Sequence, residues 1–418
     1  MLHLLFALYL IFFCWLAVRI PFIKKTGLSP TWIIGLFLVK VGAAMAYGWF
    51  HTQLLHYETE ADTWRFFFES KPQTQLLLRN PLGFFADTFA NPYGRDYRHF
   101  FAAANSFWND LKHVYMVKLM AIFNLFSGGH YYINTIFYSF LTFFGPVAFL
   151  RMMNDVFPGR LQLLTLSTFL FPSFLFWTAG IHKDGLIFLY ISVLVYHFYY
   201  GLQQQRFPLY RALWVIAMLA LIFPLRNHVV LAVLPGLAAW WLAERYLKHR
   251  VWVAFLLVSL VGTTVFFGSK YVHPKINLPV SIVLRNQEFL KLGGNSMLPQ
   301  RPLEATLKSF VQNAPQALNH AMARPYLTEN ASALYVLCGL EIMLAWLLVF
   351  IWFFRFTENP YRHGVVYFLL FISLLLLLLT GYIVPQLGAL VRYRSIYFPM
   401  ILVPIIATIR WDGVALKK

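Results

Sequence analysis

The chain has 418 residues, of which 60% are hydrophobic and only 12% charged. A soluble domain carries about 25% charged residues, so this composition excludes an ordinary soluble protein and predicts a polytopic helical membrane protein. The net charge of +18 does not indicate nucleic-acid binding, because the basic residues are scattered at the ends of apolar segments and no groove-reading motif is present.

Eleven apolar segments are predicted to cross the membrane as α-helices. In chain order they are residues 2–19, 31–50, 131–150, 161–179, 185–201, 212–225, 229–244, 251–268, 333–354, 364–383 and 395–409. Cys14 and Cys338 lie within two of them, so we expect neither a disulfide nor a zinc site. The sequence therefore predicts an all-α transmembrane bundle of about eleven spans, with residues 1–418 forming a single integral membrane domain.

The orientation follows from the basic residues. Lys and Arg follow every odd-numbered segment, and such residues collect in cytoplasmic loops, so the N-terminus is expected outside. Two long loops, residues 51–130 and 269–331, then face outward and contain amphipathic stretches expected to form interfacial helices. Residues 114–126 are apolar but short and include Lys118, which predicts an interfacial or re-entrant helix and not another span.

Four polar clusters fall at the outer ends of these segments. In chain order they are HYETEADTWRF from His56, the turn His182-Lys183-Asp184, PLRNHVV with Arg226 and His228, and GALVRYRSIYFP with Arg392 and Arg394. A carboxylate can take a proton from an attacking hydroxyl, and Arg and Lys can bind a departing phosphate. Together the clusters predict group transfer from a phosphorylated lipid, although each alone also fits residues that anchor a span at the interface.

The same residues resemble a known family. An acid in the first long outer loop, then PSFLFWTAGIHKD, then a late RYRSIYFPMILV resemble the GT-C glycosyltransferases, most closely bacterial members of the dolichyl-phosphate-mannose and aminoarabinose transferase type. The family's Pro-Ser, aromatic turn and Lys/Arg-Asp pattern looks like Pro172, Ser173, Trp177, Lys183 and Asp184. The resemblance covers residues 31 to 409, but only these short motifs are specific.

The resemblance implies an inverting enzyme of the bacterial inner membrane, with its active site facing the periplasm. It would move a sugar from a polyprenyl-phosphate donor to a lipid-linked or glycan acceptor among the membrane lipids. The family's catalytic base is an acid in the first outer loop. ETEAD offers Glu58, Glu60 and Asp62, of which we favour Asp62, with Glu60 second. The chain departs from the pattern, since its acid follows the second span and lacks an adjacent acid.

The remaining assignments concern the donor. Its contacts are expected from His182, Lys183, Asp184, Arg226, His228, Arg392 and Arg394. No convincing metal-ligand set is visible, and a divalent metal, which some relatives use, stays open as a cofactor. We expect His113, His130 and His320 to face solvent.

Two alternative functions remain open. A polysaccharide polymerase or ligase of the O-antigen type also holds its diphosphate-linked donor with outward arginines, but the early acidic loop favours a carboxylate base. A lipid or glycan transporter gains support from the intramembrane charges Lys40 and Glu341. Transporters of this kind usually contain internal repeats, and none is visible here.

Overall fold

The protein is described by a computed structural model, whose described residues are almost entirely helical. They are residues 2–54, 61–89, 107–204, 206–272, 276–294, 296–329, 332–357 and 363–411. Within these ranges no strand occurs, and the extended pairing is confined to two isolated bridges, Met297 with Gln386 and Phe356 with Ile409. The predicted all-α class is confirmed.

Eight helices in the described ranges are long and apolar enough to cross a membrane. They are α1 (Leu2–Arg19), α3 (Pro30–Trp49), α7 (Tyr131–Val156), α10 (Lys183–Leu202), α12 (Asn227–Tyr246), α13 (Val251–Val272), α16 (Ala333–Arg355) and α17 (Gly364–Ile383). The chain is thus an integral, multi-pass membrane protein.

Three further predicted spans are less regular. Two are helix pairs bent by 58° and 55°, which raise the number of candidate spans to ten if each pair is one span. These pairs are α8 (Leu161–Phe169) with α9 (Pro172–Ala179), and α18 (Leu387–Ser395) with α19 (Phe398–Thr408). The third, α11 (Leu209–Leu225), is an apolar helix of 17 residues. The count of eleven spans therefore stays a prediction.

The two predicted loops contain helices that do not qualify as spans. The first holds η1 (Phe50–Leu54), α4 (Asp62–Arg79), α5 (Pro81–Ala86), η2 (Asp87–Phe89) and α6 (Phe107–Ser127), and the second holds α14 (Leu278–Lys291) and α15 (Leu307–Ala323). The short α2 (Pro21–Lys24) follows α1. Residues 114–126, expected not to cross the membrane, lie within α6, which is not a candidate span.

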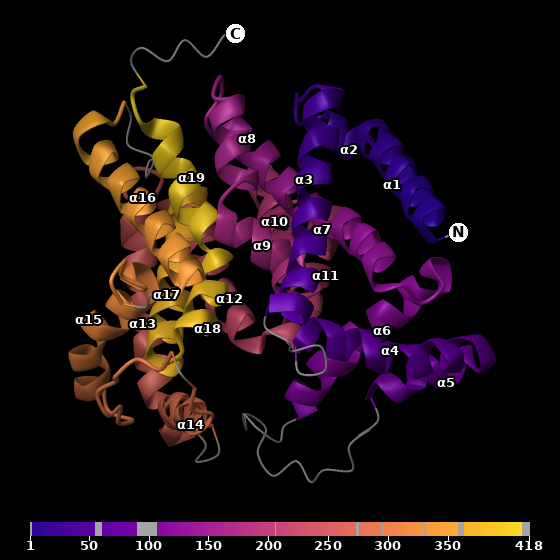
Figure 1. The fold of residues 1–418 in the computed structure, drawn as a ribbon. Coiled ribbons are helices and arrows are strands. Elements are labelled where there is room, and N and C mark those ends of the chain that lie inside the picture. The colour runs from indigo at the N-terminus through magenta and orange to yellow at the C-terminus, as the bar shows by residue number, and fades with distance from the viewer. Residues whose placement is uncertain are drawn as a thin grey trace. The chain divides into compact units, whose positions relative to one another are not determined.

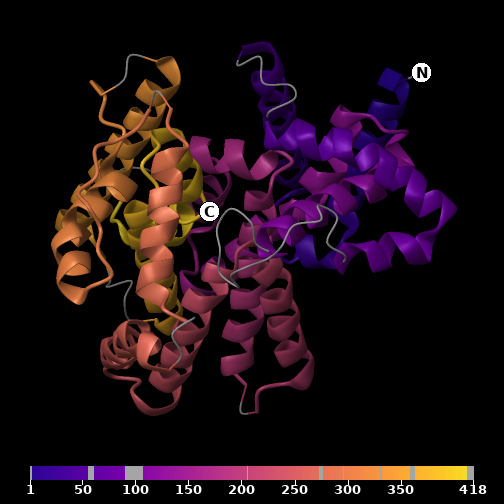
Figure 2. The same ribbon diagram turned by 90° about the horizontal axis from the view of Figure 1, so that it is seen from below.

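The chain folds into two compact units. The first contains α1 to α7 and α9 to α11, and the second contains α13 to α19 and α12 from His228 onward, while α8 contributes residues to both. In the first unit α10 packs on both α7 and α11. Figure 2 shows α10 and α11 side by side as an antiparallel hairpin, so the start of α10 lies next to the end of α11.

Close helix contacts in the first unit depend on small residues. A Cβ added to Gly145 of α7 would lie 2.8 Å from the Cα of Leu189 in α10. The two backbones therefore approach as they do at small-residue interfaces between membrane helices. Elsewhere in this unit, α4 lies across the C-terminal end of α3 (Figure 1). This crossing brings the start of α4 to the start of α10.

The second unit is organised around α17, which packs on α13, α14, α15, α18 and α19. Gly381 of α17 faces the backbone of Ala317 in α15, and an added Cβ would lie 1.9 Å from the Ala317 carbonyl oxygen. The amphipathic α15 therefore lies directly against a candidate span.

Candidate active site

The beginning of α4 is fixed by contacts with α3 and α7. The indole N–H of Trp64 donates to the carbonyl of Gly48 at 3.1 Å, and its ring stacks on Tyr131 at a centroid distance of 3.9 Å. The Thr63 and Tyr131 hydroxyls are hydrogen-bonded at 2.7 Å. Gly48 permits this contact, because a Cβ there would lie 2.4 Å from the Tyr131 ring. Asp62, the first residue of α4, is thereby held in a defined place.

The turn between α9 and α10 is held by two long-range hydrogen bonds. The Tyr138 hydroxyl of α7 donates to the carbonyl of His182, and the buried Lys40 ammonium of α3 donates to the carbonyl of Thr178 at 3.2 Å. Lys40 thus satisfies a carbonyl at the C-terminal end of α9, where the helix dipole also favours a cation. Gly185 allows close packing here, since a Cβ would lie 2.4 Å from the Thr178 oxygen.

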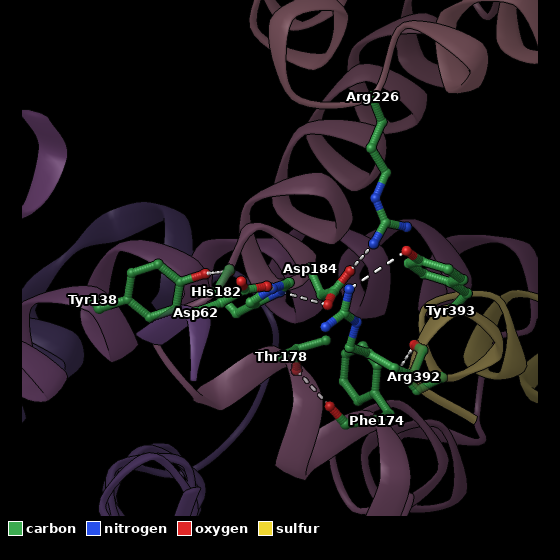
Figure 3. A network of polar contacts seen from close by, with 10 residues as sticks. Asp62, Tyr138, Phe174, Thr178, His182, Asp184, Arg226, Arg392 and Tyr393 are labelled. Atoms are coloured by element: carbon green, nitrogen blue, oxygen red, sulfur yellow. Dashed lines mark hydrogen bonds and ion pairs between the residues drawn. The ribbon is translucent and has the colours of Figure 1, made fainter. Parts of the chain in front are cut away.

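Four charged or titratable side chains follow one another from these elements (Figure 3). His182 Nε2 lies 3.0 Å from Asp62 Oδ2, and its Nδ1 lies 2.7 Å from Asp184 Oδ2. The second carboxylate oxygen of Asp184 accepts a hydrogen bond from Nη2 of Arg226, at the end of α11. The result is a continuous series of carboxylate, imidazole, carboxylate and guanidinium.

Burial separates one member of this series from the other three. The side chains of His182 and Asp184 are fully buried and that of Arg226 nearly so, whereas 47% of the Asp62 side chain is exposed. The buried Asp184 carboxylate requires a compensating charge, which Arg226 supplies. Asp62 is therefore the group that can exchange a proton with a bound molecule, and His182 can orient it.

A second acid–imidazole pair lies further along α4. Glu69 Oε1 accepts from Arg65 Nε at 2.9 Å, and its Oε2 contacts Nε2 of His113 in α6. Burial raises the pKa of Glu69, but the hydrogen bonds and charges of Arg65 and His113 outweigh it and bring the pKa below its ordinary value. The Phe66 ring lies between the two imidazoles, with centroids 5.2 Å from His113 and 6.4 Å from His182.

Two expectations about histidines were wrong. The His113 side chain is only 16% exposed because it pairs with Glu69, and His320 is buried within the second unit. Both lie on amphipathic helices, whose buried face the sequence alone did not identify. His130 is half-buried.

The other predicted site residues are distributed as follows. Lys183 is buried in the first turn of α10. Glu60, the second choice for the base, lies outside the described residues. His228 is exposed in the first turn of α12, and Arg392 is half-buried with Nη2 3.5 Å from the Tyr393 hydroxyl (Figure 3). His228, Arg392 and Arg394 belong to the second unit.

Arg394 is committed to contacts inside that unit. Its Nη1 donates to the carbonyls of Ala321 at 3.2 Å and Arg324 at 2.5 Å, and its guanidinium lies 5.0 Å from the Phe398 ring centroid. Glu341 of α16 interacts with it electrostatically. These contacts favour a structural role for Arg394, and its assignment to the donor stays a prediction.

The sequence did not reveal what supports the site. Tyr138 and Lys40 hold the turn from helices far away in the chain, and the pairing of Asp184 with Arg226 joins residues that were both assigned to the donor. The available signal was an unexplained lysine inside an apolar span. In the part of the chain that is described, no group of three or more His, Cys, Asp or Glu side chains is arranged to hold a metal ion.

Comparisons with known proteins do not add to this picture. No protein-family model matches the sequence, and neither a curated protein nor a solved structure matches it.

Proposed function

We propose that the protein is an inverting membrane glycosyltransferase of the GT-C type. It would move a sugar from a polyprenyl-phosphate donor to a hydroxyl of a lipid-linked or glycan acceptor. The observation that carries the proposal is the half-exposed Asp62 carboxylate held by the buried series His182, Asp184 and Arg226.

In the proposed step Asp62 takes the proton from the acceptor hydroxyl as its oxygen attacks the anomeric carbon. A new carbon–oxygen bond forms, the bond between that carbon and the phosphate oxygen breaks, and polyprenyl phosphate leaves with the electron pair. Attack from the face opposite the phosphate inverts the anomeric configuration. His182 orients the Asp62 carboxylate and stabilises the proton that it gains.

The donor assignments that follow from the family resemblance differ in their support. Arg226 and Arg394 are engaged with Asp184 and with backbone carbonyls, respectively. Lys183, His228 and Arg392 stay assigned to the donor phosphate by the resemblance, and Lys and Arg can neutralise charge as it develops on a departing phosphate.

The proposed location is the bacterial inner membrane with Asp62 on the periplasmic side. The distribution of basic residues supports this orientation, because they follow the odd-numbered apolar segments and such loops stay in the cytoplasm. Reporter fusions at residues 95 and 155 test it. A periplasmic signal at 95 and a cytoplasmic one at 155 are expected, and a periplasmic signal at 155 would reverse the orientation.

The test of function is sugar transfer from a radiolabelled polyprenyl-phosphate-sugar pool in membranes. Wild type should transfer label, Asp62→Asn should lose transfer, and Arg392→Ala should weaken use of the donor. Glu69→Gln is the matched control, because it neutralises another partly exposed acid on α4. Lengthening of diphosphate-linked glycans without use of monophosphate donors would instead indicate the polymerase.

The transporter stays a second candidate function, favoured by the intramembrane charges Lys40 and Glu341. Lys40 donates to the Thr178 carbonyl and Glu341 acts on Arg394. Both charges have partners within their own unit, and transport of a labelled lipid without sugar transfer would favour this alternative.

A further inference from the structure

The α4–α5 region exposes large apolar side chains where the chain does not span the membrane. Leu82 is 84% exposed and Phe89 71% exposed, and Leu78 and Phe85 are also more than half exposed. We call Leu78, Leu82, Phe85 and Phe89 the apolar tip. Leu82, Phe85 and Phe89 recur at helical spacing over α5 and η2, so they share one face.

The inner side of the same region combines the buried Phe84 ring with a set of polar contacts. The buried Lys118 ammonium of α6 donates to the Phe84 carbonyl, donates to Gln73 Oε1 at 3.2 Å and lies 3.5 Å from Asp87 Oδ2. Asn80 also accepts from the backbone N–H of Gly83 at 2.9 Å, which fixes the start of α5. Contacts of this kind hold α5 in place while its apolar side chains point outward.

This arrangement differs from that of a water-exposed helix, because large apolar side chains are exposed while the Lys118 ammonium is buried. In water, apolar side chains would turn inward and the lysine outward, and exposed apolar patches mark interaction sites. An exposed apolar surface above the buried polar contacts of Lys118 is expected where the surrounding medium is itself apolar. The unit therefore needs something apolar to cover the tip.

The helix that holds α5 in place, α6, also contacts the candidate span α1. About 12 Å beyond Lys118 along α6, the Phe126 carbonyl accepts from the Tyr9 hydroxyl of α1. Phe126 itself is exposed, and only 6% of the apolar stretch of the candidate span α1 is buried inside the protein. Arg79 and Lys71 are exposed on α4, as expected for residues that meet lipid phosphates at the membrane surface.

We infer that the apolar tip inserts into the lipid bilayer at the membrane interface, next to α1. Leu82, Phe85 and Phe89 would lie among acyl chains while Arg79 and Lys71 lie at the headgroups. The same helix, α4, starts at Asp62, so insertion of its far end would hold the candidate base near the membrane surface. Insertion is inferred from the exposure of these side chains and from the contact of α6 with α1. It does not depend on the proposed sugar transfer.

The test is depth-dependent fluorescence quenching in lipid nanodiscs that contain a single copy of the protein. Leu82→Cys and Phe85→Cys are made in a Cys14→Ala, Cys338→Ala background and labelled with bimane. Gln204→Cys, exposed in the connection between α10 and α11, is the matched control. The nanodiscs contain phosphatidylcholine and phosphatidylglycerol, with nitroxides at the headgroup or on the acyl chain, and iodide is the aqueous quencher.

Labels at residues 82 and 85 should be quenched by shallow acyl-chain nitroxides at least twofold more than the label at 204, and they should be several-fold less sensitive to iodide. Iodide quenching equal to that at 204, with no excess lipid quenching at either position, would overturn the proposal. Shielding that appears only when a nanodisc holds two copies would also overturn it, because a second copy would then cover the tip.

Discussion

Two charged motifs lie at helix ends in this protein, and they satisfy their charges in different ways. In the turn before α10, His182 and Asp184 contact other titratable side chains, ending at the half-exposed Asp62. In α18, the buried Arg394 donates to two backbone carbonyls. The half-exposed Asp62 can exchange a proton with a bound molecule, whereas the contacts of the Arg394 guanidinium with carbonyls favour a structural role.

The comparison shows that a charged residue in a membrane protein is not by itself a mark of chemistry. Burying a charge is costly, and both charged side chains and backbone carbonyls can offset that cost. What distinguishes the first motif is a titratable group that reaches solvent. The predictions below separate the two motifs by the kind of damage that each substitution should cause.

The largest expected effect is on the stability of the first unit. Arg226→Ala removes the guanidinium that compensates the charge of the fully buried Asp184 and should destabilise the protein by about 3–5 kcal/mol. The unfolding midpoint in detergent measures this, with the exposed Arg206→Ala as control. Arg226→Met combined with Asp184→Asn should recover part of the loss, because no buried charge then remains uncompensated. A change no larger than that of the control would mean that the pair is not formed.

Arg394→Met should have the next largest effect, and that effect should be on stability and not on sugar transfer. The Ala321 and Arg324 carbonyls lose a charged donor, which should cost about 2–3 kcal/mol. The unfolding midpoint should fall, whereas the neighbouring half-buried Arg392→Met should change it little. If Arg394→Met instead left the midpoint intact and weakened use of the donor, the two motifs would be functionally alike.

His182→Gln should affect transfer more than stability. We treat His182 as a positioning residue in this prediction, because it contacts the Asp62 carboxylate. We expect the kcat of transfer to fall tenfold to a hundredfold, about 1.4–2.7 kcal/mol, with the donor KM nearly unchanged. His113→Gln is the control, since it also contacts α4 but through Glu69. Equal kcat values in the two variants would remove His182 from the mechanism.

The smallest effect concerns acid stability. The folded-state pKa of Glu69 lies below its ordinary value of 4.5, so its contribution is fully present above about pH 4.5 and is lost as the pH falls through the folded pKa. Because Glu69 is partly exposed, the contribution should be under about 1 kcal/mol. The unfolding midpoints of wild type and Glu69→Gln should differ at pH 7 and converge towards pH 3. A constant difference over this range would contradict the assignment.

The sequence predicted the helical class well, because long apolar segments have few alternatives in a membrane. It also selected Asp62, His182, Asp184 and Arg226 as site residues, since charges at span ends are conspicuous. It could not predict that Asp184 pairs with Arg226, because that contact depends on how α10 and α11 pack. Polar residues inside the protein, such as Lys40, were equally hidden, since their partners are backbone carbonyls that every residue carries.

Periodicity also could not separate the two faces of an amphipathic helix in a membrane protein. His113 and His320 were expected in solvent, but both side chains are largely buried. The side chains of the apolar tip, by contrast, are exposed. In water the apolar face is the buried one, but at an interface either face can meet the protein. Only the three-dimensional contacts of Glu69 and Lys118 decide which face is inward.

The central claim is that Asp62 acts in the transfer step itself. The most direct measurement is single-turnover transfer from a prebound, labelled polyprenyl-phosphate sugar, comparing wild type with Asp62→Asn. We predict that Asp62→Asn binds the donor as wild type does and transfers the sugar at least a hundredfold more slowly. Transfer by Asp62→Asn at the wild-type rate would contradict the account, and the base would then have to be sought elsewhere.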